Sequence, residues 1–272
     1  MTDDLQHRPG GERPTLDDAA YSCGHRSQGA PNRVARIRDT VPLMTPHDLF
    51  RLHPFLGALT ESESRELLAH AVRRRVAAGH VVFRKDDPGD GFYGVLAGRV
   101  VVTVESAAGK ELILNMFGPG EFFGEIALLD GKGRTATAIA REPSELLFLS
   151  RAVFQPFLAQ RPDATMRIIA LLCSRIRRTT DLVEDSAFLG VATRLAKQLG
   201  VLMDRYGRPE RTDTSAATLH ISQEELARTL GVSREIVSRQ LAIWREAGIV
   251  ELGRSRLTVL DPEALHGIID GG

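Results

Sequence analysis

The spacing of apolar residues changes twice along this chain of 272 residues, and each change limits the folds that it can adopt. Between residues 72 and 150, short β-type runs alternate with turns rich in glycine and proline. From 161 to 188 apolar residues recur at helical spacing, and shorter helical segments follow over 190–272. Strands and helices therefore occupy separate parts of the chain, which predicts an α+β protein with more than one domain.

The β-type block contains five short runs of β-branched and other apolar residues. Turn signals such as Asp87-Pro88-Gly89-Asp90 and Gly118-Pro119-Gly120 separate the runs. This length and punctuation are typical of a β-sandwich or barrel. The preceding residues 46–70 predict one or two short helices, with Thr60 as an N-cap. The five runs are residues 81–83, 93–96, 100–104, 112–114 and 146–149.

Residues 161–188 predict one long helix with a seam of the coiled-coil type. The residues of this seam recur alternately three and four positions apart: Ile169, Leu172, Ile176, Thr179, Val183 and Ser186. The helix could pack on its own domain, but most of its remaining surface is charged. We therefore favour a homodimer joined along the seam, although the polar Thr179 within it requires an explanation.

The C-terminal part predicts a helix-turn-helix. Ser222 and Glu225 have the spacing of a capping box, Gly231 turns the chain, and Ser233 is the expected cap of the next helix. One face of that helix carries polar residues, and we expect these together with Ser222 and Ser233 to meet DNA: Arg234, Glu235, Ser238 and Arg239. The opposite face is apolar and is expected to enter the core: Ile236, Val237, Leu241 and Trp244.

The polar side chains suit base recognition, because arginine can bond to guanine and glutamate can accept from cytosine. A solvated charged face is the alternative, but the capped helix-turn-helix context favours DNA. Residues 249–251 and 257–259 would form a wing near the phosphates, joined through the turn at 253–256.

A second motif lies within the β-type block, where residues 122–129 lead through a glycine-rich turn to Arg134 and Thr135. Gly124 permits close backbone approach, and the following amides can face an anion. Arg134 and Thr135 can bind a phosphate, while Glu125 suits a ribose hydroxyl. The motif therefore predicts a nucleotide site, unless Glu125 and Arg134 simply pair with each other in the sheet.

Composition excludes several classes of protein. Lys plus Arg and Asp plus Glu each number 35, so the net charge is zero and gives no evidence for or against nucleic acid. Two cysteines are too few for a disulfide framework or an iron–sulfur cluster, and we expect no metal site. No apolar run is long enough to span a membrane, and the first ten residues do not have the pattern of a signal peptide. The sequence also shows no nucleophile–base pair, metal cluster or phosphate-transfer loop. We expect a cytoplasmic protein that is not an enzyme.

Together these motifs resemble the cyclic-AMP receptor protein (Crp–Fnr) superfamily of bacterial transcription regulators, over roughly residues 48–262. The resemblance implies a cyclic-nucleotide-binding β-roll, a dimerisation helix and a winged helix-turn-helix. It places Glu125 at the ribose, Arg134 and Thr135 at the cyclic phosphate, and Thr179 and Thr180 at the base, one from each subunit. The implied nucleotide-binding residues are Phe123, Gly124, Glu125, Ile126, Ala127, Arg134, Thr135, Thr179 and Thr180.

The resemblance also implies that Ser233, Arg234, Glu235 and Arg239 read a TGTGA-like site in double-stranded DNA, and that RNA polymerase is a partner. It favours cAMP as the effector because most of the family uses it; cGMP, another effector or none is the alternative. A cyclic-nucleotide module without a DNA function is a second alternative. Two residues depart from the family pattern: Gly190, where Asp is common, and Ile236, where a small hydroxyl residue is common.

The resulting division of the chain has four parts. We expect a disordered leader over 1–45, a β-roll domain over 46–160, a dimerisation helix over 161–189 and a DNA-binding domain over 190–272.

Overall fold

The computed structural model describes residues 44–53, 56–209 and 216–271. The leader expected over 1–45 lies outside these residues, apart from its last two positions. The described chain begins with helix α1 (Pro46–Leu52), a 3-10 turn η1 (Leu56–Ala58) and helix α2 (Glu61–Ala69). Thr60 closes a capping box with Glu63 at the start of α2, which confirms the predicted cap.

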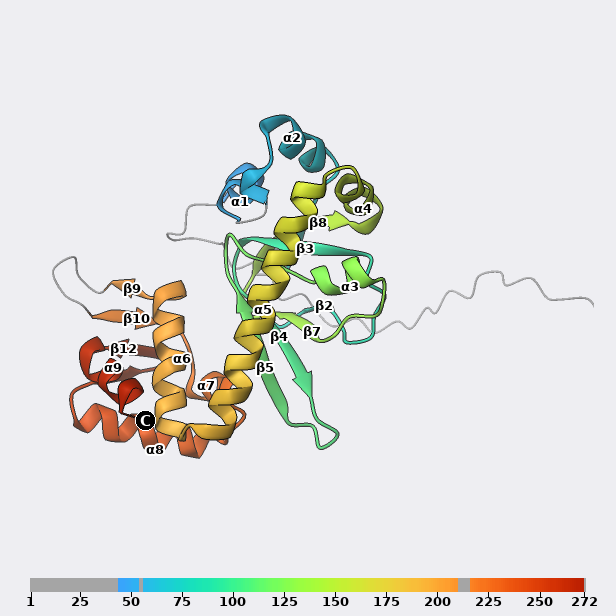
Figure 1. Ribbon diagram of the computed structural model, residues 1–272. Helices are drawn as coiled ribbons and strands as arrows, with labels where there is room; N and C mark the ends of the chain where they lie inside the picture. The colour runs from blue at the N-terminus through green and yellow to red at the C-terminus, as the bar shows by residue number, and fades with distance from the viewer. Residues whose placement is uncertain (1–43, 54–55, 210–215, 272) are drawn as a thin grey trace, which may run out of the picture. The chain divides into compact units, whose positions relative to one another are not determined.

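Two four-stranded antiparallel sheets follow (Figure 1). One sheet has the order β1-β8-β3-β6 and the other β2-β7-β4-β5. An aromatic-rich core cluster takes residues from both sheets, among them Tyr93, Phe117 and Phe123. The strands are β1 (Val72–Val76), β2 (Val81–Phe83), β3 (Gly91–Ala97), β4 (Val100–Glu105), β5 (Glu111–Phe117), β6 (Phe122–Phe123), β7 (Thr137–Ala140) and β8 (Ser144–Ser150).

All five predicted β-type runs lie in strands of these sheets. Strand β1 was not predicted, because its three consecutive arginines hide any apolar alternation, and neither were the short strands β6 and β7. Helix α3 (Glu125–Asp130) stands between β6 and β7, at the motif that the sequence singles out.

Helix α4 (Arg151–Ala159) leads into α5 (Pro162–Phe188), the single long helix that the spacing predicts. Two residues of the predicted seam have other surroundings within this chain: Leu172 packs on the core of its own domain, and Thr179 lines a cavity. The stripe left exposed on α5 is Met166, Ile169, Cys173, Ile176, Thr180, Val183 and Ala187. Its members also alternate three and four positions apart, so heptad spacing alone could not distinguish the two stripes. We call this set the α5 stripe.

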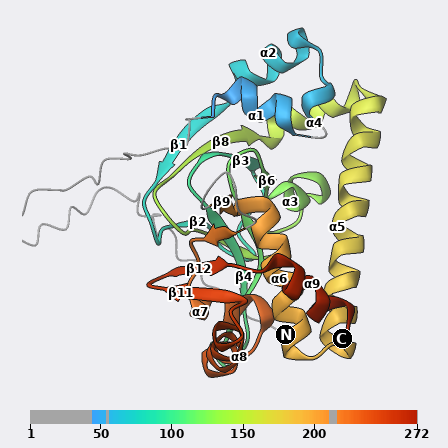
Figure 2. The same cartoon turned by 90° about the vertical axis from the view of Figure 1, so that its left-hand side faces the viewer.

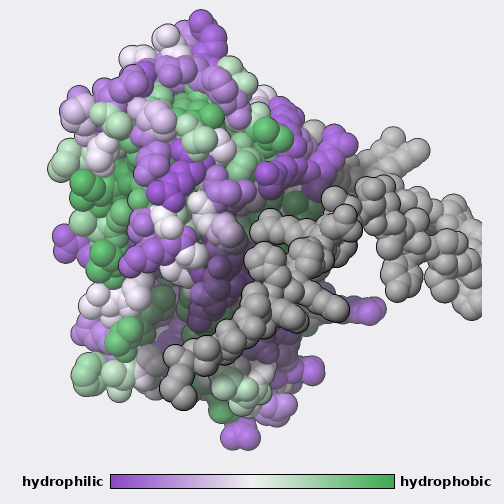
Figure 3. Space-filling model, turned by 90° about the vertical axis from the view of Figure 1, so that its right-hand side faces the viewer, coloured by the Kyte–Doolittle hydropathy of each residue, from purple (hydrophilic) through white to green (hydrophobic). Residues whose placement is uncertain are grey.

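In Figure 3, where α5 runs down the left-hand edge, hydrophobic side chains gather along that edge, while hydrophilic ones cover much of the remaining described face. A long helix with an exposed apolar stripe needs a further surface to cover it.

The C-terminal part combines helices with a small sheet of order β11-β12-β10-β9 (Figure 2). Its core contains Leu199, Leu241 and Trp244. Ile236 is 40% exposed, so its predicted place in the core is wrong; it lies on the boundary between the two faces of its helix. The elements are α6 (Val191–Tyr206), β9 (Arg208–Pro209), β10 (Ala217–Leu219), α7 (Gln223–Leu230), α8 (Arg234–Glu246), β11 (Val250–Gly253), β12 (Arg256–Val259) and α9 (Pro262–Asp270).

Candidate functional site

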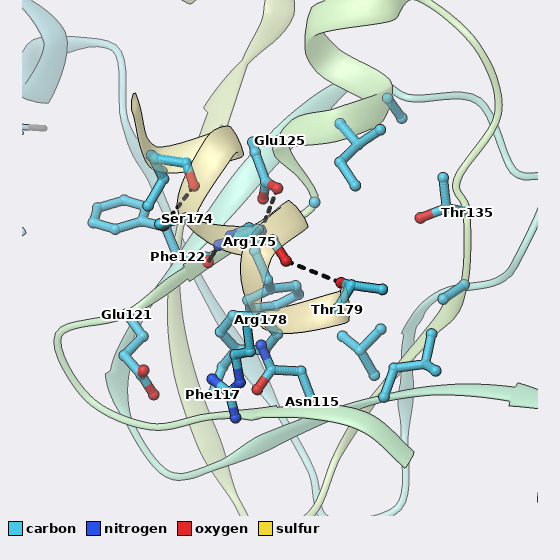
Figure 4. A pocket seen from close by; sticks show the side chains of 18 of the residues that line it. Asn115, Phe117, Glu121, Phe122, Glu125, Thr135, Ser174, Arg175, Arg178 and Thr179 are labelled. Atoms are coloured by element: carbon cyan, nitrogen blue, oxygen red, sulfur yellow. Dashed lines mark hydrogen bonds and ion pairs between the residues drawn. The ribbon is translucent and has the colours of Figure 1, made fainter. Parts of the chain in front are cut away.

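A cavity of about 550 Å³ opens between one face of α5 and the segment from β6 through α3 towards β7. Figure 4 shows it from close by, with Glu125 and Arg175 meeting on one side and Thr135 on another. Eight of the nine nucleotide-binding candidates line this cavity: Phe123, Gly124, Glu125, Ile126, Ala127, Arg134, Thr135 and Thr179. The ninth, Thr180, belongs to the α5 stripe, and its hydroxyl donates to the Ile176 carbonyl at 3.1 Å.

Gly124 connects β6 to α3 in a conformation that other residues rarely adopt. Its φ is +83°, and a Cβ at this position would lie 2.9 Å from Nη1 of Arg134. The left-handed backbone and the close approach of a guanidinium both require a residue without a side chain. Gly124 therefore lets Arg134 pass directly beneath the start of α3.

Arg134 is 2% exposed, and its guanidinium is held from two sides. Nη1 donates to the Gly124 carbonyl at 2.7 Å, and Nη2 donates to Oδ1 of Asp90 at 2.9 Å. The group also lies over the Phe83 ring, 4.3 Å from its centroid. Its Nε is buried and has no hydrogen-bond partner among the described residues.

Glu125 is also buried, and its partner comes from the long helix. Oε1 pairs with Nη1 of Arg175, whose Nη2 donates to the Phe122 carbonyl at 2.8 Å. The alternative in which Glu125 pairs with Arg134 is therefore wrong. Oε2 of Glu125 is buried without a hydrogen-bond partner among the residues described. Asp90 and Arg175 were missed, although Arg175 precedes Thr179 by one helical turn and therefore shares its face.

Glu125 and Arg134, which both line the cavity, thus carry one buried acceptor and one buried donor without a hydrogen-bond partner among the described residues. Each such atom costs about 1–3 kcal/mol while it lacks a partner. A ligand that donates a hydroxyl to Glu125 and brings an anion to Arg134 would satisfy both. A cyclic nucleotide has these two groups on one ring system, so the residues present fit it.

His53 lines the same cavity and meets Phe122 edge-on, with ring centroids 4.7 Å apart and ring planes at 68°. Burial, aided by the positive charge of Arg175, lowers the pKa of His53 from 6.5 to about 4. The imidazole is therefore neutral at physiological pH and adds no charge to the cavity.

The predicted helix-turn-helix is formed by α7 and α8. Ser222 Oγ accepts from the Glu225 amide at 3.2 Å, and Glu225 Oε2 accepts from the Ser222 amide at 2.9 Å, which confirms the capping box. The Ser222 hydroxyl also donates to the same carboxylate at 2.8 Å, so it is already committed within the protein. Gly231 follows α7 with φ +68° and turns the chain as predicted.

Helix α8 presents Arg234, Glu235 and Arg239 to solvent, and Ser238 is half-buried beside them. Ser233 stands at the N-cap position, but its side chain does not cap the backbone, which corrects the expected role. Two hydrogen bonds lower the pKa of the Glu235 carboxyl: the larger effect comes from its own backbone amide and the smaller from the Ser233 side chain. The carboxylate is therefore charged and held at the start of the helix.

The predicted wing is formed by β11 and β12, which pair antiparallel from Val250 with Val259 to Gly253 with Arg256. Its tip lies beside the N-termini of α7 and α8, around a cleft of about 300 Å³. The cleft is lined by side chains from all three elements, including Gln223, Arg234 and Arg254. Basic and amide groups at two helix N-termini form a surface that suits DNA phosphates.

Within the described ranges no group of three or more His, Cys, Asp or Glu side chains could hold a metal ion. In that same part of the chain, every helix is too short or too polar to cross a bilayer.

Comparison with known proteins gives a family for the β-sheet part and a family for the helix-turn-helix part. Residues 73–161 match the family described as cyclic nucleotide-binding domain, and residues 193–268 match the Crp-like helix-turn-helix domain. A CRP-like cAMP-activated global transcriptional regulator of Mycobacterium tuberculosis is 32% identical over 187 residues, which is 69% of this chain and 83% of that protein.

Two further proteins extend the comparison. The cyclic AMP receptor protein of Thermus thermophilus is 32% identical over 80% of this chain and 97% of its own length. The solved structure of CLP from Xanthomonas campestris, described as a c-di-GMP responsive global regulator, is similar with a TM-score of 0.63 and 30% identity. That likeness covers 74% of this chain and all of that chain.

The Mycobacterium relative is named as a transcriptional regulator, and the two family models match the β-sheet part and the helix-turn-helix part of this chain. The chain therefore belongs to the cyclic-AMP receptor protein (Crp–Fnr) superfamily and is a cyclic-nucleotide-binding regulator of transcription with a DNA-binding helix-turn-helix.

Proposed function

We propose that this regulator responds to a cyclic purine nucleotide, with cAMP the favoured effector, and acts as a homodimer on a palindromic TGTGA-like site. The observation that carries the proposal is the pair of buried unpartnered atoms, Glu125 Oε2 and Arg134 Nε, on residues that line one cavity. Relatives named as cAMP-activated support cAMP over cGMP.

Each residue of the pocket then has a defined task. Glu125 accepts a hydrogen bond from the ribose 2′-hydroxyl, and Arg134 with Thr135 binds the cyclic phosphate. Thr179 contacts the base from the same chain, because it lines the cavity. Thr180 lies on the α5 stripe and contacts the base bound in the second copy. Phe123, Ile126 and Ala127 supply the walls.

The α5 stripe supports the homodimer. A parallel pair of α5 helices would cover Ile169, Ile176 and Val183 against the same residues of a second copy. Two helix-turn-helix units would then face half-sites about one DNA turn apart, roughly 34–36 Å. Ser222, Ser233, Arg234, Glu235, Ser238 and Arg239 form the DNA face, and RNA polymerase in the cytoplasm is the expected further partner.

The ligand changes the arrangement of the protein through its contacts with Glu125 and Arg134. It contacts Glu125, already tied to α5 by Arg175, and the neighbouring Arg134, which is bonded to the Gly124 carbonyl. It must bind the DNA-competent arrangement more tightly than the other arrangement, because equal affinity would shift no population.

Calorimetric titration with cAMP and cGMP in parallel tests the proposal directly. We expect saturable binding of one nucleotide to the wild-type protein and its loss in Arg134→Leu. Fluorescence anisotropy with a labelled palindromic duplex should then show tighter DNA binding when that nucleotide is present. Binding of neither nucleotide, or equal binding by the variant, would refute the assigned pocket.

A further inference from the structure

One side of the nucleotide pocket carries more positive charge than a cyclic mononucleotide uses. Arg175, Arg178 and Arg205 all line it, in addition to Arg134. Arg175 is neutralised by Glu125, and Arg205 pairs with Glu121. Arg178 differs from both, because its guanidinium has no hydrogen-bond or ion-pair partner among the described residues.

Arg178 is half-buried on the cavity face of α5, immediately before Thr179. Burial, and after it the positive charge of Arg205, lowers the pKa of Arg178, although Tyr206 and Glu121 oppose the shift. A guanidinium that loses water and faces a second guanidinium is held at a cost in free energy unless an anion joins it. The surroundings of Arg178 therefore favour a negatively charged ligand over a neutral one.

The position of Arg178 separates it from the phosphate site at Arg134 and Thr135. In Figure 4, Arg178 lies beside Asn115, while Thr135 stands on the other side of Thr179. Asn115 is itself bound by Arg205, whose Nη1 donates to Oδ1 at 3.4 Å. Two arginines, an amide and the Glu121 carboxylate that pairs with Arg205 thus share this side. Arg178 is the positive charge that this carboxylate does not pair with directly, and arginine forks match the oxygens of a phosphate.

We propose that Arg178, with Arg205 and Asn115 beside it, forms a second phosphate-binding subsite in the nucleotide pocket. The class of ligand is then a nucleotide with two separate phosphates, such as a cyclic dinucleotide, or a cyclic mononucleotide accompanied by free phosphate. The inference deepens the proposed function and rests on it, because Arg134 must hold the first phosphate. It leaves the DNA-binding role unchanged.

The test is calorimetric titration of the full-length protein with four probes: cAMP, cGMP, cyclic di-GMP and cyclic di-AMP, the first two with and without inorganic phosphate. The variant is Arg178→Gln, and Arg134→Leu reports on the first phosphate. Arg177→Gln is the matched control, since Arg177 is the neighbouring exposed arginine of α5 and does not line the cavity.

We expect a cyclic dinucleotide that reaches both phosphate sites to lose at least tenfold in affinity in Arg178→Gln, while the affinity for cAMP alone does not change. Tighter cAMP binding in added phosphate, lost in the same variant, would assign the subsite to a separate anion. If Arg178→Gln weakens all ligands equally or none, the subsite is refuted, whereas loss in Arg134→Leu alone leaves the proposed function intact. Binding of no probe would refute both.

Discussion

Breaking the ion pair between Arg175 and Glu125 should lower the free energy of unfolding by an amount that depends on which of the two residues is replaced. The pair joins α5 to the first turn of α3, and Glu125 is almost fully buried while the Arg175 side chain is 29% exposed. Arg175→Met would leave both Glu125 oxygens unpartnered, since Oε2 already lacks a hydrogen bond among the described residues. Breaking a buried pair in this way costs about 3–5 kcal/mol, and the partial exposure of Arg175 reduces the expectation to about 2–3 kcal/mol.

Glu125→Gln should cost less, about 1 kcal/mol, because water can reach the arginine that it leaves behind. The double variant should then lose about as much as Glu125→Gln alone, since no buried carboxylate remains. The coupling free energy is therefore expected to have a magnitude of about 2–3 kcal/mol.

Urea unfolding of the four proteins at one fixed protein concentration measures this cycle, with Arg177→Met as the control for loss of a surface arginine from α5. Additive effects, with a coupling free energy below about 0.5 kcal/mol, would show that the two side chains do not form a stabilising pair. The assignment of Arg175 as the link between the pocket and the long helix would then be wrong.

Four further predictions concern other parts of the molecule. The lowered pKa of His53 means that the unfolded chain binds the extra proton between pH 6.5 and about 4, so stability should fall by up to about 3 kcal/mol as the pH drops through that window. Urea titrations at several pH values should show a flatter dependence in His53→Asn, and an unchanged slope would contradict the assignment. Gly124→Ala should cost about 1–2 kcal/mol through its positive φ and weaken nucleotide binding by displacing Arg134, whereas Gly200→Ala, with open space around it, should do neither in the same titration. Arg234→Ala should weaken DNA binding by about 1–3 kcal/mol and relax preference at one base pair; uniform weakening across site variants would indicate a phosphate contact instead. Cys173 lies on the α5 stripe, so mild oxidation of a Cys23→Ser protein should give a disulfide-linked dimer on a non-reducing gel. A control protein with Cys23→Ser, Cys173→Ser and Arg177→Cys, whose single cysteine lies off the stripe, should remain a monomer. A monomer in both cases would refute the α5 stripe as the dimer seam.

Local rules were sufficient for much of the fold. The capping boxes at Thr60 and Ser222 depend on residues three positions apart, so the sequence alone locates them. The long helix follows from uninterrupted periodicity. Strand β1 could not be recognised, because Arg74 stacks on Phe148 and bonds to Tyr93, a tertiary contact that overrides its weak strand pattern.

In the pocket, too, contacts between residues far apart in the sequence could not be predicted. Glu125, Arg134 and Thr135 stand within one segment, and their spacing was enough to predict a nucleotide site. Their partners are distant in sequence, since Asp90 is 44 positions from Arg134 and Arg175 is 50 positions from Glu125. Pairing over such distances is decided by the packed sheets and helix, so the sequence left open the alternative of a contact between Glu125 and Arg134, which the structure shows to be wrong.

The structure also indicates how the state of the pocket can reach the DNA-binding face. Glu225, which caps α7, accepts from Arg141 Nη2 at 2.8 Å, and Lys110 donates to the Gly231 carbonyl in the turn before α8 at 2.6 Å. Arg141 follows β7 and Lys110 precedes β5, two strands of the sheet to which the pocket residues of β5 belong. The sheet therefore contacts the cap and the turn of the helix-turn-helix through groups that α7 needs for its own stability. A ligand that shifts this sheet relative to α5 must either keep these contacts or break them. The free-energy difference between the arrangement with the contacts and the arrangement without them then sets how much nucleotide binding can change the affinity for DNA.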